Sequence, residues 1–258
     1  MISAKNNKPI RKEDAHIIFD LHGVLVSKEK LTQLYDNFVI NFLVENFNLS
    51  VDKTENAVEI ANKKWLNYWK EAKELPKTDL VVAYEKANAL WAEIIFQGKY
   101  KGDFRQMAEF LEYFIPTNFC SMFSEVQKEI INLHELSIPL FIASSAYTRH
   151  TLGVLIGCKI SNYFNKIIGL ENTLALKCSK EYYQKAFSII GTKPENCIFV
   201  GNSQNEIELP KLLGAKVVHI TREITDGTAN YESLNSADLV LPNLINFSKL
   251  LFENNILD

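Results

Sequence analysis

The sequence has few cysteines, no long apolar run and no excess of positive charge. Its four cysteines, Cys120, Cys158, Cys178 and Cys197, are far apart, none forms a CxxC pair, and no two histidines have the spacing of zinc ligands. This argues against a disulfide scaffold or a structural zinc site and suits a reducing compartment. No apolar run approaches the roughly 20 residues of a membrane span. The net charge of −3 favours neither nucleic acid nor an anionic membrane. We therefore expect a cytoplasmic protein with no membrane or nucleic-acid partner.

Short apolar segments alternate with amphipathic stretches along most of the chain. The first, HIIFDLHGVL at residues 16–25, starts as an apolar run and then reaches Asp and Gly. Further runs lie at 139–146, 166–170, 197–202, 216–220 and 238–242, with helical spacing of apolar residues between them. Strands that alternate with helices of this length predict an α/β fold with a doubly wound parallel sheet.

Residues 28–114 interrupt this alternation. Leu31, Leu34, Phe38 and Phe42 recur at helical spacing, and similar aromatic and aliphatic stripes follow to Phe114. We expect an all-helical cap domain over 28–114, inserted into a Rossmann-like core domain formed by 1–27 and 115–258. The insertion should lie over the carboxyl ends of the strands, where open α/β sheets bind their ligands.

Polar residues follow the predicted strands in a fixed order. Asp20-Leu21-His22-Gly23 follows the first strand and Ser144-Ser145 the second, while Gly201-Asn202-Ser203 follows a later strand, with Glu206 one helical turn on. Lys177 lies between the last two groups, just before a predicted helix. Each group alone is a weak signal, but their order around a helical insertion is specific.

With these groups, the sequence resembles the haloacid dehalogenase-like (HAD) superfamily over residues 14–242. FDLHGVL is similar to the family's DxDG motif, FIASS to the second motif, LALKCSKEYY to the lysine motif, and GNSQNEI to GDSxxDI. Histidine stands where the second aspartate of DxDG usually lies, and Asn and Glu replace the two aspartates of the last motif. The resemblance implies three sets of residues: catalytic Asp20, His22 and Lys177; substrate-binding Ser144, Ser145 and Gly23; and a Mg²⁺ site at Asp20, His22 (by its backbone carbonyl), Asn202 and Glu206.

The chemistry of such a site shows what these replacements change. An aspartate can attack phosphorus to form an acyl-phosphate, provided that cations and hydrogen-bond donors offset the negative charge. The imidazole of His22, with an ordinary pKa of ~6.5, can serve as acid and base. Because Mg²⁺ prefers charged oxygen ligands, the neutral Asn202 and the longer Glu206 should weaken its binding.

The residues leave three functions open. A HAD-like phosphatase acting on a small phosphorylated metabolite is the first, and a non-catalytic protein that binds a ligand or another protein is the second. The third is a metal-free dehalogenase-type hydrolase, although GNSQNE lacks the SSN-plus-Asp spacing of that branch and no Arg closely follows the first motif. The isolated histidines His134, His150 and His219 are expected at the surface or at strand edges. The sequence does not indicate an oligomeric state.

Overall fold

The computed structural model describes residues 8–72, 79–222 and 236–258, and its core is a six-stranded parallel sheet. The strands lie in the order β3-β2-β1-β4-β5-β6, so that the chain starts at the centre of the sheet and crosses from one half to the other. The predicted doubly wound sheet is therefore confirmed. The strands are β1 (His16–Phe19), β2 (Leu140–Ala143), β3 (Lys166–Ile168), β4 (Cys197–Gly201), β5 (Lys216–Ile220) and β6 (Leu239–Leu241).

Helices cover both faces of the sheet, which explains why its strands are apolar on both sides. On β1, Ile17 and Phe19 pack with α5 (Val126–Glu135), α6 (Thr148–Gly157) and α11 (Phe247–Glu253), whereas Ile18 faces α8 (Lys180–Ile190) and α9 (Gln204–Leu212). The remaining short helices connect these elements: η1 (Lys12–Asp14), η4 (Ser161–Tyr163), α7 (Leu170–Thr173) and η5 (Pro194–Asn196).

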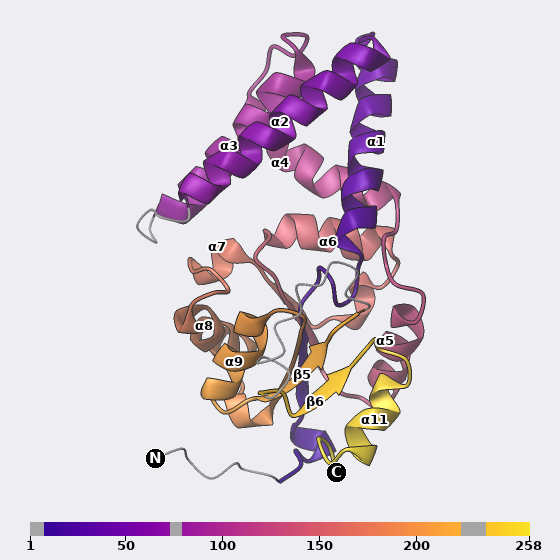
Figure 1. Ribbon diagram of the computed structural model, residues 1–258, viewed down its shortest axis with the longest axis vertical. Helices are drawn as coiled ribbons and strands as arrows, with labels where there is room; N and C mark the ends of the chain where they lie inside the picture. The colour runs from indigo at the N-terminus through magenta and orange to yellow at the C-terminus, as the bar shows by residue number, and fades with distance from the viewer. Residues whose placement is uncertain (1–7, 73–78, 223–235) are drawn as a thin grey trace.

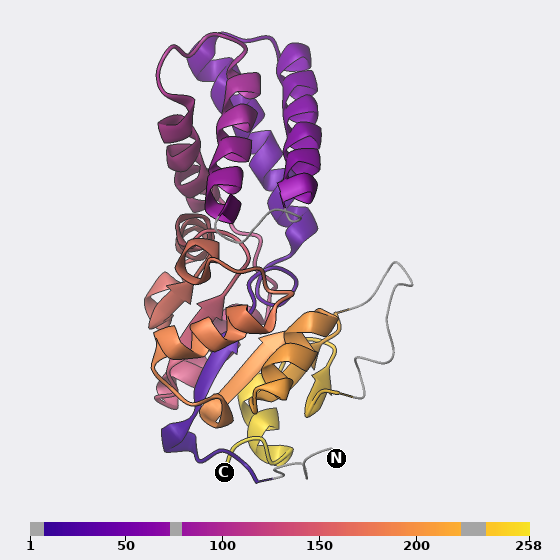
Figure 2. The ribbon, with the colours of Figure 1, turned by 90° about the vertical axis from the view of Figure 1, so that its left-hand side faces the viewer.

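In the described residues, four of the helices between β1 and β2 form a bundle that stands at one end of the core (Figures 1 and 2). They are α1 (Lys28–Phe47), α2 (Val51–Ala72), α3 (Leu80–Phe96) and α4 (Phe104–Phe114), followed by η3 (Ile115–Asn118). The bundle has its own apolar core, to which every one of the four contributes, including Leu43, Val58, Ile95 and Leu111. The Ser27 hydroxyl accepts the Lys30 amide and so begins α1, and Asp103 caps α4 in the same way. The division into two domains at 27/28 and 114/115 stays a prediction.

The insertion leaves and rejoins the core through two segments that lie side by side. The amide of Ser27 donates to the carbonyl of Ser121 (2.9 Å), and that of Phe123 donates to the carbonyl of Leu25 (3.2 Å). Val26 and Met122 form an antiparallel bridge between these two contacts. The first segment starts at the carboxyl end of β1, so it also carries the residues expected in the site. Among the helices of the described ranges, none is both long and apolar enough to span a membrane.

Candidate functional site

Three charged side chains from distant parts of the chain meet beside the carboxyl end of β1. The Lys177 ammonium lies 2.5 Å from Oδ1 of Asp20 and 2.5 Å from Oε1 of Glu206. All three residues are buried, at 5–7% exposure. Lysine carries one positive charge against two carboxylates, so the ionised cluster has a net charge of −1. The structure thus brings together three residues that the sequence placed in one site.

Burial and mutual contact set the charges of this cluster. Burial, followed by the charge of Glu206, raises the pKa of Asp20, although Lys177 opposes the shift. Burial also acts to raise the pKa of Glu206, but Lys177 and the donors at Asn202 and Ser203 outweigh it and hold this pKa below its ordinary value. For Lys177, burial is outweighed by the two carboxylates, and its pKa is raised. Lys177 therefore stays protonated while Asp20 is the group that most easily gains a proton.

Glu206 is engaged at both of its carboxylate oxygens. Oε1 contacts Lys177, while Oε2 accepts the backbone amides of Asn202 (3.0 Å) and Ser203 (3.2 Å) at the start of α9. With Ser203 as N-cap, this is a capping box, which satisfies amides that a helix N-terminus leaves free. Gly201 permits the close approach, because a Cβ there would lie 2.6 Å from that of Glu206. The extra methylene of Glu206 lets one side chain serve Lys177 and the helix together.

The loop that follows Asp20 packs against Asn202. The amide of Gly23 donates to the carbonyl of Val26 (2.7 Å), which closes a tight turn in which Gly23 has φ +85°. A Cβ at Gly23 would lie 2.0 Å from Nδ2 of Asn202, so any other residue would have to displace the Asn202 amide as well as adopt a positive φ. Asn202 is otherwise exposed. The first and last sequence motifs are therefore in direct contact at the edge of the charged cluster.

His22 stacks on His150, which belongs to none of the sequence motifs. The rings of His22 and His150 have centroids 5.7 Å apart and an interplanar angle of 25°. Burial, followed by the neighbouring His150, lowers the pKa of His22 to about 3, and burial lowers that of His150 to about 4. His150 also hydrogen-bonds the backbone of Glu112, in α4 of the insertion. The expectation of a surface or edge position is wrong for His150, which links the insertion to His22.

The same expectation is wrong for His219. This residue lies in β5, which is paired on both sides by β4 and β6, and its side chain is 6% exposed. Its ring hydrogen-bonds the backbone of Asn202, which raises its pKa, but burial dominates and the net shift is downward. An apolar strand containing one histidine gave no signal that this ring would support the loop after the neighbouring strand.

The two serines that follow β2 have different surroundings. Ser144 is buried; its hydroxyl accepts the amide of Ala146 (3.2 Å), and its carbonyl accepts the hydroxyl of Tyr182 (2.9 Å). Ser145 is exposed. Ser144 thus shapes the loop, and Ser145 is open to a ligand. That either serine binds substrate stays a prediction, as do the assigned roles of Gly23 and His22.

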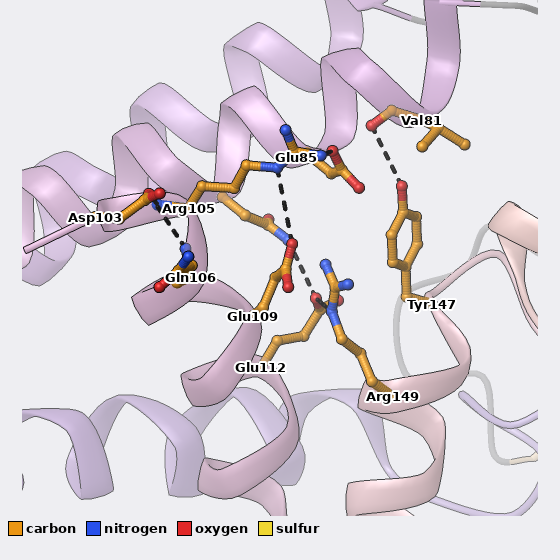
Figure 3. A network of polar contacts seen from close by, with 10 residues as sticks. Val81, Glu85, Asp103, Arg105, Gln106, Glu109, Glu112, Tyr147 and Arg149 are labelled. Atoms are coloured by element: carbon orange, nitrogen blue, oxygen red, sulfur yellow. Dashed lines mark hydrogen bonds and ion pairs between the residues drawn. The ribbon is translucent and has the colours of Figure 1, made fainter.

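A polar and aromatic network joins this loop to the helical insertion (Figure 3). Glu112 of α4 accepts the Tyr84 hydroxyl (2.6 Å) and pairs with Arg149 of α6 (2.5 Å). Tyr147, just after the serines, stacks on Tyr84 with centroids 4.3 Å apart, and its hydroxyl donates to the carbonyl of Val81 (3.2 Å). None of these residues belongs to a motif, and their apolar spacing indicated only a core. The network places aromatic rings from the insertion beside the serine loop.

The residues around Asp20 provide few ligands for a metal ion. Within residues 8–72, 79–222 and 236–258, no three His, Cys, Asp or Glu side chains converge so that they could hold one. Glu206 is committed to Lys177 and to α9. What is left is one carboxylate at Asp20, the amide oxygen of Asn202 and backbone carbonyls. Because the cluster of Asp20, Lys177 and Glu206 has a net charge of −1 when ionised, a divalent cation fits it electrostatically, but with only one charged ligand.

Comparison with known proteins assigns the chain to one family of hydrolases. The family model described as haloacid dehalogenase-like hydrolase matches residues 15–214. The phosphoglycolate phosphatase of Pectobacterium atrosepticum is 25% identical over 121 residues, which cover 47% of this chain and 51% of the relative. That of Photorhabdus laumondii is 24% identical over 161 residues, covering 62% of this chain and 67% of the relative. The chain spans about half the length of several curated relatives that it matches.

Solved structures share the fold over nearly the whole chain. The magnesium-bound HAD-hydrolase YfnB from Bacillus subtilis has a TM-score of 0.59 at 17% identity and covers 95% of this chain and 99% of its own. The L-2-haloacid dehalogenase from Xanthobacter autotrophicus has a TM-score of 0.56 at 15% identity, with coverage of 92% and 98%. At such low identity, these similarities establish the fold alone.

Proposed function

Because the chain belongs to the haloacid dehalogenase-like hydrolase family, we propose that it is a phosphatase that hydrolyses a small phosphorylated metabolite through an aspartyl nucleophile. The observation that carries the proposal is the buried contact of Lys177 with both Asp20 and Glu206. A simple ion pair has one carboxylate, whereas Lys177 contacts two. Here a lysine with a raised pKa is held by Glu206 so that it faces Asp20, which is the arrangement that a carboxylate nucleophile for an anionic substrate requires.

Asp20 is the nucleophile in this proposal. A carboxylate oxygen of Asp20 forms a bond to phosphorus, and the bond from phosphorus to the leaving oxygen breaks with its electron pair. Water then attacks phosphorus, which releases inorganic phosphate and restores the carboxylate. Lys177 stabilises the charge on the phosphoryl oxygens in both steps. Ser145, exposed at the end of the second strand, and the nearby backbone amides are placed to donate hydrogen bonds to the same group.

His22 acts as the base of the second step. Its lowered pKa leaves the ring neutral near pH 7, with a free lone pair for a proton of the attacking water. A pKa of about 3 makes the free ring a weak base, so this role requires the negative charge of the bound phosphoryl group to raise its basicity. A neutral ring does not bring a proton to the leaving oxygen in the first step. The proposed enzyme should therefore favour substrates whose leaving group is stable without protonation, such as aryl phosphates.

Asp20, Asn202 and the backbone carbonyl of His22 would hold a Mg²⁺ ion, and Glu206 instead fixes Lys177. When bound, the ion would supply positive charge that lowers the repulsion between Asp20 and a phosphate dianion. The neutral Asn202 supports the expectation that binding is weaker than at a site with two carboxylates. The magnesium-bound YfnB structure, with the same fold, supports the choice of ion.

Phosphoglycolate, an alkyl phosphate, is the substrate to test beside an aryl phosphate, since several curated relatives are named for it. The aromatic rings of Tyr84 and Tyr147 between the insertion and the serine loop support an organic leaving group. All four cysteines are free and Cys178 is exposed, which supports a reducing compartment such as the cytoplasm.

The test is the release of phosphate from p-nitrophenyl phosphate and phosphoglycolate, with and without Mg²⁺. Asp20→Asn should abolish turnover, whereas Asp14→Asn, which changes an exposed carboxylate paired with Arg11, should leave it unchanged. No release by the wild-type protein, or equal release by Asp20→Asn, would refute the phosphatase.

A metal-free dehalogenase-type hydrolase is the second candidate, because the neutral Asn202 leaves one charged ligand for a metal. In that reaction Asp20 attacks carbon and halide leaves, so no cation is needed. Chloride release from 2-chloropropionate that persists in a chelator and is lost in Asp20→Asn would select this candidate. The absence of both activities would favour a non-catalytic binding protein.

A further inference from the structure

Arg222 contacts both of the segments that join the helical insertion to the core. It lies two residues beyond the end of β5, at Ile220. Its Nε donates to the carbonyl of Gly23 (3.4 Å) and its Nη2 to the carbonyl of Val24, in the first segment. Its Nη1 pairs with Glu125, in the second segment, and its guanidinium lies 3.6 Å from the centroid of the Phe123 ring. The side chain of Arg222 therefore contacts both connecting segments.

These contacts are shielded from solvent and supported by further ones. The side chains of Arg222 and Glu125 are 17% and 14% exposed. Glu125 also accepts the amide of Leu244 (3.3 Å), which fixes the carboxylate in place. Since charged hydrogen bonds with little solvent access are stronger than exposed ion pairs, this cluster should add measurable rigidity.

The backbone of Arg222 is in a conformation that a non-glycine residue rarely adopts. Its φ is +45°, in the left-handed region, which is unfavourable for a side chain with a Cβ. Such strain persists where surrounding contacts hold it, and it is concentrated at functional positions. Here the contacts that hold it are those of the guanidinium with the two segments.

We propose that Arg222 is a positioning residue that clamps the two connecting segments to each other and to the end of β5. The clamp fixes the loop at 21–26, whose residues follow Asp20 and include His22, and it restrains how the insertion moves relative to the core. A planar guanidinium can donate to two carbonyls and a carboxylate at the same time, which a lysine ammonium at this position would not match. The effect on catalysis rests on the proposed phosphatase; the effect on the segments does not.

Hydrogen exchange on the full chain tests the clamp directly. The amides of Gly23, Ser27 and Phe123 report on it, because each donates within or between the two segments. In Arg222→Met their protection should fall about tenfold or more, the size expected for the loss of one charge-assisted hydrogen bond. Arg222→Lys should lose nearly as much protection, because it keeps the positive charge but not the planar set of guanidinium donors. Arg105→Met, which removes an exposed arginine paired with Glu85 in the insertion, is the matched control and should change none of these amides.

Two results would overturn the clamp. One is unchanged protection of these amides in folded Arg222→Met; the other is an equal loss throughout β4 and β5, which would mean general destabilisation. If Arg222→Met does not fold, Glu125→Gln decides, since it keeps an acceptor for Leu244 and removes the charge. In Glu125→Gln, a loss of amide protection that is confined to the two segments supports the clamp. Unchanged protection in these segments refutes it.

Kinetics separate the clamp from the proposed function. If the wild-type protein hydrolyses p-nitrophenyl phosphate, Arg222→Met should lower kcat by a larger factor than it changes KM, because the loop after Asp20 is less well placed, while Arg105→Met should change neither. An unchanged kcat would refute the catalytic part of the proposal. If the wild-type protein hydrolyses no phosphate ester, the phosphatase fails, and the exchange result still decides the clamp.

Discussion

The rings of His22 and His150 lie stacked at a centroid distance of 5.7 Å, one in the loop after β1 and the other at the start of α6. His150 also hydrogen-bonds the backbone of Glu112, so the helical insertion, α6 and the loop after β1 meet in one short chain of contacts. Burial disfavours the protonated form of both imidazoles, so both rings are neutral near pH 7.

This pair predicts a loss of stability on mild acidification. Both pKa values are lower in the folded protein, to about 3 and about 4, than the ordinary value of 6.5. As the pH falls below 6.5, the unfolded chain gains protons that the folded protein does not, and the free energy of unfolding decreases. Each ring should contribute a slope of about 1.4 kcal/mol per pH unit. Urea unfolding of the wild-type protein and of His150→Asn between pH 7 and pH 4.5 measures the difference.

The comparison of the two proteins reports mainly on His150, because burial, the largest cause of the lowered pKa of His22, acts in both. The free energy of unfolding of His150→Asn should depend on pH less steeply, by about 1.4 kcal/mol per pH unit, because one fewer proton is taken up on unfolding. His134→Asn, at an exposed position, should keep the wild-type slope. Identical slopes for wild type and His150→Asn would show that His150 titrates alike in both states.

Removing Lys177 should destabilise the protein as well as inactivate it. Lys177→Met leaves two buried carboxylates at Asp20 and Glu206 without their cation, and the loss of one partner from a buried ion pair costs about 3–5 kcal/mol. The double variant Lys177→Met/Asp20→Asn should recover part of this loss, because one of the two charges is gone.

Urea unfolding at pH 7.5 measures this cycle. Lys249→Met, which breaks an exposed pair with Glu253, should cost no more than about 0.5 kcal/mol. Additive effects of Lys177→Met and Asp20→Asn would contradict the charge coupling among the three residues.

Restoring a carboxylate at position 202 should strengthen magnesium binding. Asn202→Asp has nearly the same shape and adds a negative charge beside the Gly23 loop. A tenfold or greater decrease in Kd, about 1.4 kcal/mol or more, is expected. Isothermal titration with Mg²⁺ measures it.

Asn205→Asp is the control for this change, because it adds the same charge at an exposed position on α9. Its Mg²⁺ affinity should equal that of the wild-type protein. If Asn202→Asp binds no more tightly than Asn205→Asp, position 202 does not ligate the ion.

The sequence predicted those parts of the fold and site that depend on local pattern. All six strands begin within the predicted apolar runs, because a strand buried on both faces leaves a continuous apolar segment. The resemblance of their motifs to the HAD superfamily placed Asp20, Lys177 and Glu206 in one site, and the structure brings their side chains into contact.

The parts that could not be predicted depend on how the insertion meets the core. The contact of Glu112 with Arg149, the stacking of His22 on His150, and the contacts of Arg222 join residues far apart in sequence; Arg222 and Val24 are 198 positions apart. No periodicity or motif indicates which polar residue on a helix will face another domain. The partner of Glu206 could not be predicted either. With its extra methylene, the carboxylate could reach a metal ion or Lys177, and the structure shows the contact with Lys177.

The contact between Gly23 and Asn202 predicts that Gly23→Ala is more harmful than a similar substitution at another positive φ. Gly98 has φ +75°, and a Cβ at that position would have nothing within 4 Å, so Gly98→Ala should cost only the conformational strain, about 1 kcal/mol. Gly23→Ala adds a steric clash with Asn202 to the same strain at φ +85°. It should also displace the loop that carries His22, and so lower kcat in any assay in which the wild-type protein is active.

A double variant separates the two costs of Gly23→Ala. Asn202→Ala removes the clashing amide, so Gly23→Ala/Asn202→Ala should regain the part of the stability that the clash removed and be left with a strain like that of Gly98→Ala. Chemical unfolding of the four variants gives the coupling between positions 23 and 202. Equal losses for Gly23→Ala and Gly98→Ala, with no recovery in the double variant, would mean that the Asn202 side chain moves aside freely and that the first and last motifs are not held together by this contact.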